Sequence, residues 1–156
     1  MLKNLAMEEG YAKTRIVGTS RPGEHGGVTS IANSVNTSGV IVGQSDGSST
    51  QGHWHAVLWN TSQKIQDLGV LAGGTYSIAY GVNDSSVVVG YGNLFNNAPR
   101  AMRWTSGGGM KDLNSLIPAG SGWVLINANS INNVGQITGY GTKNGHNHAF
   151  MLTPVN

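Results

Sequence analysis

One pattern of residues occurs three times along the chain, and this repeat limits the fold more than any other feature. Each copy begins with an apolar stretch that ends in Asn and continues with a short apolar run that ends in Gly. A third apolar segment follows, which in two copies starts with His-Ala. The Asn residues are Asn36, Asn83 and Asn132, so the copies are spaced by 47 and 49 residues. A period of this length is typical of proteins in which each repeat is one small unit stacked on its neighbours.

The pattern inside each copy predicts about four short β-strands. Ile78, Tyr80 and Val82 alternate with small residues, as in a strand with one buried face. The segment 132–135, Asn-Asn-Val-Gly, has the composition of a turn. No long window keeps a helical spacing, and charged residues make up only 10% of the chain, too few for a helical bundle. The sequence therefore predicts an all-β fold of three four-stranded repeat units.

We expect a single repeat domain over residues 1–156. Its units are expected at about residues 30–74, 75–122 and 123–156. The third unit stops before a fourth strand, and the N-terminal segment 1–10 resembles residues 65–73. We expect this segment to complete the third unit, because such closure removes exposed sheet edges. Residues 11–29 fit the repeat less well and are expected to be irregular.

The repeated residues carry a resemblance to a known family. Over residues 30–152 the pattern reads Ser-x-Ala-x-x-(Ile/Val)-Asn, (Val/Ile)-x-Gly, His-Ala-(Phe/Val)-x-Trp and Asp-Leu-(Gly/Asn). It resembles the HAF repeat of bacterial, mostly exported proteins, although Arg100 stands where the family pattern has His. The resemblance implies a propeller-like arrangement in which each unit is one four-stranded blade.

Three blades are too few for a closed propeller, which usually has about four to eight. A homodimer that pools three blades per chain would solve this. The alternative folds are a β-trefoil or a β-prism with threefold symmetry.

Charge and hydropathy exclude several partners. The net charge is +2 and the basic residues are scattered, so we expect no nucleic-acid partner. No segment reaches the roughly 20 apolar residues of a membrane-spanning helix, so we expect no membrane span. The HAF resemblance implies export, whereas no signal peptide is visible in this chain, so the location is left open.

Two His-x-His segments and the repeated Asn residues are candidate metal ligands. His53 and His55 form one pair and His146 and His148 the other, and residues two apart on a strand share a face. The simpler interpretation is that His55 and His148 make a fixed hydrogen bond in each unit. Ca²⁺ is the expected metal if the strand ends converge, because it accepts neutral oxygen ligands. Zn²⁺ is less expected, since no Cys or Asp lies nearby in sequence. The candidate Ca²⁺ ligands are Asn36, Asn83 and Asn132.

A Gly-x-Ser-x-Gly motif spans residues 43–47 and places Ser45 at the position of a nucleophile. No helix is expected after it, and the repeat itself explains its first Gly, so the match favours a chance occurrence. If Ser45 is a nucleophile, its base must be one of His25, His53 and His55. Glu24 and His25 lie outside the repeat, where functional residues are often added.

Four aromatic residues break or decorate the repeat and could stack on sugar rings beside Asn-rich loops. They are Trp54, Tyr91, Trp123 and Tyr140. With few carboxylates and no complete catalytic set, the sequence favours a non-catalytic module that binds a carbohydrate or another protein. The alternative is a small Ca²⁺-dependent hydrolase that acts on lactones such as acyl-homoserine lactones, on esters or on glycosides. Either interpretation predicts a small-molecule or glycan ligand.

Overall fold

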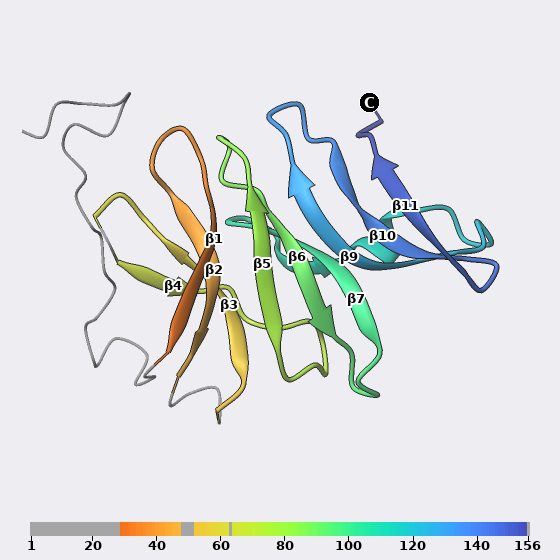
Figure 1. The fold of residues 1–156 in the computed structure, drawn as a ribbon, viewed down its shortest axis with the longest axis horizontal. Coiled ribbons are helices and arrows are strands. Elements are labelled where there is room, and N and C mark those ends of the chain that lie inside the picture. The colour runs from red at the N-terminus through yellow and green to blue at the C-terminus, as the bar shows by residue number, and fades with distance from the viewer. Residues whose placement is uncertain (1–28, 48–51, 63, 156) are drawn as a thin grey trace, which may run out of the picture.

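The computed structural model describes residues 29–47, 52–62 and 64–155. These residues form three antiparallel β-sheets that lie side by side (Figure 1), which confirms the prediction of an all-β fold. The first sheet has the order β1 (Ser30–Val35), β2 (Ile41–Asp46), β3 (Trp54–Trp59), β4 (Ile65–Asp67). The second has the order β5 (Ser77–Val82), β6 (Val88–Asn93), β7 (Pro99–Thr105), β8 (Gly109–Asp112). The third has the order β11 (His146–Leu152), β10 (Ile137–Lys143), β9 (Trp123–Ile131).

The described sheets form an open row, with the C-terminal end of the chain at the third sheet (Figure 1). The third sheet has three strands among the described residues. The segment 1–10, expected to be its fourth strand, lies outside the described residues, as does 11–28 of the segment expected to be irregular. A short 3-10 helix, η2 (Leu113–Leu116), follows β8. In the described part of the chain, no helix has the length and apolar character needed to cross a membrane.

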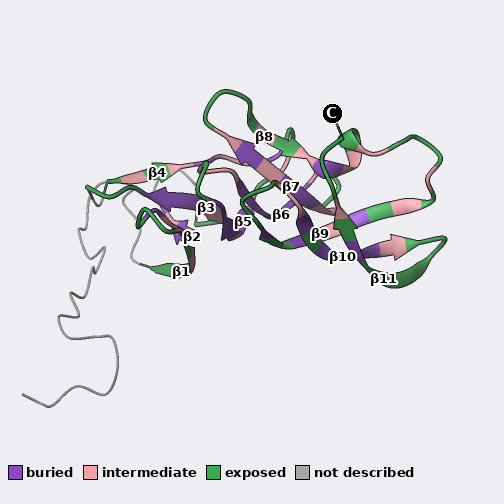
Figure 2. Ribbon diagram, turned by 90° about the horizontal axis from the view of Figure 1, so that it is seen from above, coloured by how far each residue is buried: buried purple, intermediate pink, exposed green. Residues whose placement is uncertain are grey.

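The first strands of the second and third sheets each pack on the face of the preceding sheet. β5 packs across β1, β2 and β3, and β9 packs across β5, β6 and β7. Each junction has its own apolar core, and Figure 2 shows the buried residues between the sheets. The core between the first and second sheets contains Val42, Ala56, Leu58, Ala79, Val82, Val88, Met102 and Trp104. The core between the second and third sheets contains Val89, Ala101, Leu113, Leu125, Ala128, Ile131, Ile137 and Phe150.

A β-bulge in each first strand explains the Gly of the repeat. The register shifts at Asn33 in β1, at Tyr80 in β5 and at Asn129 in β9. The bulge brings a carbonyl of the first strand against the second strand. A Cβ atom on Gly43 would lie 1.9 Å from the carbonyl oxygen of Ile31. A Cβ atom on Gly90 would lie 2.0 Å from the carbonyl oxygen of Ile78, and one on Gly139 would lie 2.0 Å from that of Asn127. Only Gly fits at these three positions.

The turn after each first strand needs one residue in the left-handed conformation. That residue is Gly39 with a φ of 85°, Ser86 with a φ of 57° and Gly135 with a φ of 82°. It is the third residue after the repeated Asn, which itself has a negative φ. Ser86 is the one of the three that carries a side chain, and a side chain makes this conformation unfavourable.

We therefore expect Ser86→Gly to stabilise the protein by about 0.5–1 kcal/mol. The matched control is Gly39→Ser, which should destabilise by a similar amount, because a Cβ atom at Gly39 meets no atom within 4 Å and only backbone strain is added. Urea unfolding of both variants measures the two free energies. A lower midpoint for Ser86→Gly contradicts the expected strain.

Candidate functional site

The repeated His or Arg position contacts the repeated Asp within a sheet. His55 Nδ1 on β3 lies 2.9 Å from Asp67 Oδ2 on β4. In the second sheet Arg100 takes the place of the His, and its Nε lies 3.5 Å from Asp112 Oδ2. Both carboxylates also cap a turn, since Asp67 accepts a hydrogen bond from the Gly69 backbone N–H at 2.7 Å and Asp112 accepts one from the Asn114 backbone N–H at 2.8 Å. Arg100, which stands where the other two units have His, therefore keeps the pairing.

Ser45 lies directly opposite His55 in the β2–β3 register, whereas Asp67, which contacts His55, lies opposite Val57, so the three residues form a diagonal row across three strands. Two carbonyl oxygens lie within hydrogen-bond distance of the Ser45 hydroxyl and can accept its proton. They are the oxygen of Thr29, at 3.2 Å, and the oxygen of Asp46, at 3.0 Å. Ser45 is buried on a regular strand rather than on a turn into a helix. Of the His residues considered as a base, the described structure brings His55 to Ser45.

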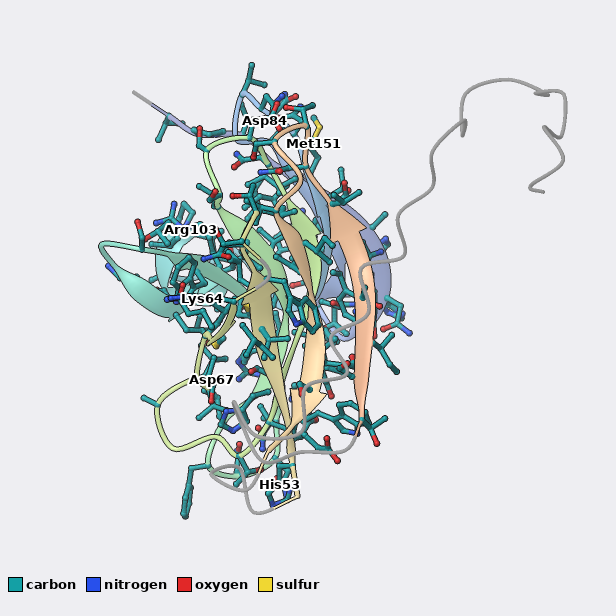
Figure 3. The ribbon with its side chains drawn as sticks, turned by 90° about the vertical axis from the view of Figure 1, so that its left-hand side faces the viewer. His53, Lys64, Asp67, Asp84, Arg103 and Met151 are labelled. Atoms are coloured by element: carbon teal, nitrogen blue, oxygen red, sulfur yellow. The ribbon has the colours of Figure 1, made fainter. Side chains whose placement is uncertain are left out.

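The other candidate His residues lie apart from this row. His53 is exposed just before β3, at the end of the molecule opposite to Asp84 and Met151 (Figure 3). His146 is exposed and lies opposite Lys143. Glu24 and His25 lie outside the described residues. Within the described ranges, no three His, Asp or Glu side chains come together in a way that could hold a metal ion.

The repeated Asn residues connect neighbouring sheets. The Oδ1 atom of Asn83 accepts hydrogen bonds from the backbone N–H groups of Ser85 and Val87 and so closes the turn. Its Nδ2 atom donates to the Asn132 carbonyl oxygen at 3.2 Å, and Asn36 Nδ2 donates to the Asn83 carbonyl oxygen at 3.0 Å. The Oδ1 atom of Asn83 and the carbonyl oxygens of Asn83 and Asn132, which belong to candidate Ca²⁺ ligands, therefore already accept hydrogen bonds from protein groups.

A second chain of hydrogen bonds runs beside the first. Asp84 Oδ1 accepts a hydrogen bond from the Thr37 backbone N–H at 2.9 Å, and the Asp84 backbone N–H donates to Asn133 Oδ1 at 2.9 Å. Asn133 Nδ2 returns a hydrogen bond to Asp84 Oδ2 at 2.6 Å. The hydroxyl and then the backbone N–H of Thr37, with a smaller contribution from Asn133, hold the pKa of the Asp84 carboxyl below its usual range.

Four tyrosines gather near the second and third sheets, and we call them the tyrosine cluster: Tyr76, Tyr80, Tyr91 and Tyr140. The Tyr76 and Tyr91 rings have centroids 5.5 Å apart and planes tilted by 46°, and their hydroxyl oxygens lie 2.5 Å apart. Burial and the hydrogen bond with Tyr76 raise the pKa of Tyr91 to about 12. Burial raises the pKa of Tyr80 most, and the phenols of Tyr91 and Tyr140 raise it further. Burial and neighbouring phenols raise both pKa values, so Tyr80 and Tyr91 are uncharged at neutral pH.

A buried amide fixes the position of Tyr76. Asn93, which is 1% exposed, accepts hydrogen bonds on Oδ1 from the backbone N–H groups of Thr75 and Tyr76, both at 2.9 Å. Its Nδ2 atom donates to Asn97 Oδ1 and to the Thr75 hydroxyl. The backbone before β5 is therefore held to the end of β6, which keeps the Tyr76 ring against Tyr91.

The two tryptophans that we considered as sugar platforms lie elsewhere. Trp123 makes edge contacts with the rings of His148 and Phe150, at centroid distances of 6.1 and 6.4 Å, and Lys143 Nζ lies 5.7 Å from its ring centroid. Trp54 begins β3, opposite Asp46. Of the four aromatic residues predicted as sugar platforms, Tyr91 and Tyr140 both raise the pKa of Tyr80, whereas Trp54 and Trp123 have other neighbours. Tyr76 and Tyr80, which the sequence interpretation missed, complete the cluster.

The chain was compared with models of known protein families, with curated proteins and with solved structures, and no match was found in any of the three.

The lowered pKa of Asp84 predicts a pH-dependent contribution to stability. The unfolded pKa is about 3.9 and the folded pKa is lower, so the contribution is present above about pH 4 and is lost as pH falls through the folded value. Asp84→Asn keeps a hydrogen-bond acceptor, as Asn133 shows at the same position of the third unit, but carries no charge. We expect Asp84→Asn to be less stable than the native protein at pH 7, and we expect the difference to shrink at acidic pH, as pH falls through the folded pKa.

Urea unfolding at pH 7 and at acidic pH measures this difference. The control, Asp84→Ala, lacks the acceptor altogether and should be destabilised at both pH values. If the native protein and Asp84→Asn differ equally at pH 7 and at low pH, the charge of Asp84 makes no contribution.

Proposed function

We propose that this protein is a non-catalytic module that binds a neutral carbohydrate on the tyrosine cluster. The proposal includes the HAF-like repeat and a propeller-like arrangement of its sheets. The observation that carries it is the cluster itself: Tyr76, Tyr80 and Tyr91 are partly buried, Tyr140 is 44% exposed, and the hydroxyls of Tyr76 and Tyr91 are joined by a hydrogen bond. A fixed ring loses little conformational entropy when a ligand stacks on it, which favours binding.

The chemistry of the cluster suits a sugar. Tyrosine rings offer an apolar face to the C–H groups of a pyranose, and their hydroxyls exchange hydrogen bonds with sugar hydroxyls. Amide side chains accompany them, since Asn127 lies directly opposite Tyr140 and donates from Nδ2 to Asn129 Oδ1 at 2.9 Å. The absence of charge from the cluster's own phenols favours a neutral ligand over an anionic one.

The residues at equivalent positions of the other units show which side chains can replace the tyrosine rings with little risk to the fold. The first unit has Gln44 where the second has Tyr91, and the first and third units have Asn33 and Asn129 where the second has Tyr80. We expect the double variant Tyr80→Asn, Tyr91→Gln to fold and to bind a neutral oligosaccharide roughly tenfold or more weakly, because each stacked ring contributes about 0.5–1.5 kcal/mol. A glycan array followed by calorimetry on the best binder measures the effect.

Phe95→Ala is the matched control, because Phe95 is an aromatic side chain in a loop and is 88% exposed. It should leave binding unchanged. Equal binding by the native protein and the folded double variant would exclude the tyrosine cluster as the binding site.

A second candidate function, ester or lactone hydrolysis, is favoured by the row of Ser45, His55 and Asp67. In this mechanism Asp67 orients the imidazole through Nδ1, and Nε2 takes the proton of Ser45 Oγ as that oxygen attacks the carbonyl carbon. The protonated His55 then gives the proton to the leaving alkoxide, and water releases the acyl group. The binding module is the better-supported function, because the equivalent Arg100–Asp112 pair lies opposite Gly92, where no hydroxyl is present.

An ester assay separates the two candidates. For a binding module, Ser45→Ala, His55→Ala and the native protein should all show background hydrolysis of a nitrophenyl acetate, with His53→Ala as the matched exposed control. Turnover that is lost in Ser45→Ala and in His55→Ala, but kept in His53→Ala, would establish the hydrolase instead. Circular dichroism of each variant shows whether a loss of turnover reflects unfolding.

A further inference from the structure

β1, the first of the described strands, carries a docking surface that is exposed. In β5, Ala79 and Val82 are 0% and 7% exposed because they pack on the first sheet. Their equivalents in β9, Ala128 and Ile131, are 0% and 9% exposed on the second sheet. The equivalents in β1 are Ala32, which is exposed, and Val35, which is 62% exposed. β1 thus has the side chains of a docking strand, and these side chains are exposed to solvent.

The last sheet has the complementary surface. Val42 and Ala56 of the first sheet lie under β5 and are 0% exposed, and Val89 and Ala101 of the second sheet are equally buried in the next core. The same two positions of the third sheet are Thr138 and Ala149, both exposed. Met151, equivalent to the buried Leu58, is 62% exposed. Figure 2 shows the exposed strands β1 and β11 at the two ends of the row.

The hydrogen bonds between sheets also stop at the last sheet. Asn36 and Asn83 each donate from Nδ2 to the carbonyl oxygen of the next repeated Asn. Asn132 Nδ2 donates instead to Gln136 Oε1 of its own turn, at 2.7 Å. The next acceptor in this series would be the carbonyl oxygen of Asn36 on a β1 strand placed against the third sheet.

We propose that β1 of one copy of this chain docks on the exposed face of the third sheet of a second copy, as β5 docks on the first sheet. The exposed face and the exposed strand match the two sides of both internal junctions. Such an interface is heterologous, so the copies join head to tail. Two copies contribute six of the described sheets, a number within the range of about four to eight of closed propellers. The interface does not depend on carbohydrate binding.

Two substitutions test the two sides separately in the full chain. Ala149→Arg places a long charged side chain where Ala56 and Ala101 are covered by a docked strand. Val35→Lys places a charge where Val82 and Ile131 are buried. Both native residues are exposed within one chain, so neither change should affect the fold of the isolated chain. Light scattering after gel filtration should give about twice 16.3 kDa for the native protein and about 16.3 kDa for each variant.

The mixture of the two variants is the decisive sample. Each variant keeps one intact side, so an equimolar mixture should form one intact junction and recover a species of two copies. Phe95→Lys, on a loop that belongs to neither face, is the control and should associate like the native protein. A native protein that is monomeric at all concentrations overturns the proposal and shows that the faces are unoccupied or covered within one chain. Association in both single variants, or no recovery in the mixture, overturns the head-to-tail geometry.

Discussion

The packing of β5 on the first sheet and of β9 on the second sheet is the interaction on which the rest of the molecule depends. The described chain has no helical layer, and its apolar side chains become buried where β5 and β9 cross the neighbouring sheet. Val35 and Val82 occupy the same place in their units, yet one is 62% exposed and the other 7%. The difference comes from the sheet on which β5 packs. Burying one such side chain contributes about 1.5–3 kcal/mol, so the junctions supply much of the stability.

The β-bulge allows this packing and also leaves one position in each first strand free to change its residue type. It lets the first strand turn its apolar residues toward the preceding sheet and leaves one extra residue outside the pairing at Asn33, Tyr80 and Asn129. Asn33 uses this position to donate a hydrogen bond to the Ala79 carbonyl oxygen of the next sheet. Because the extra residue takes no part in the strand register, it can change from Asn to Tyr without disturbing the core. The second unit makes that change at Tyr80.

Much of the fold was accessible from the sequence, because alternation, turn residues and the repeat all report local geometry. The reason for the repeated Gly was not accessible, because it depends on the bulge that brings the Ile31 carbonyl against Gly43. The pairing of the repeated His with Asp had a signal that could have been read. Asp67 follows His55 by 12 residues, and Asp112 follows Arg100 by the same number.

The tyrosine cluster had a weaker signal. Tyr76 lies before β5, Tyr91 on β6 and Tyr140 on β10, so no local sequence pattern links them to Tyr80, whose pKa Tyr91 and Tyr140 raise. The His-x-His spacing predicted a shared face, but His53 precedes β3 and His55 is bound to Asp67. Spacing along a strand indicates a common face only where the strand includes both residues.

Equivalent positions of the three units fall into two groups: positions whose residue type is limited by packing and positions that are free of this limit. Positions that keep their residue type, such as Ala56 of β3, Ala101 of β7 and the Gly of each second strand, are those where a neighbouring strand leaves no room for a larger side chain. Positions that change type, such as Gln44, Tyr91 and Tyr140, are free of that limit. Tyr140 is 44% exposed on the same face of the third sheet as Thr138 and Ala149. A second copy docked on that face would therefore reduce the exposure of one member of the tyrosine cluster, and the two proposals meet at Tyr140.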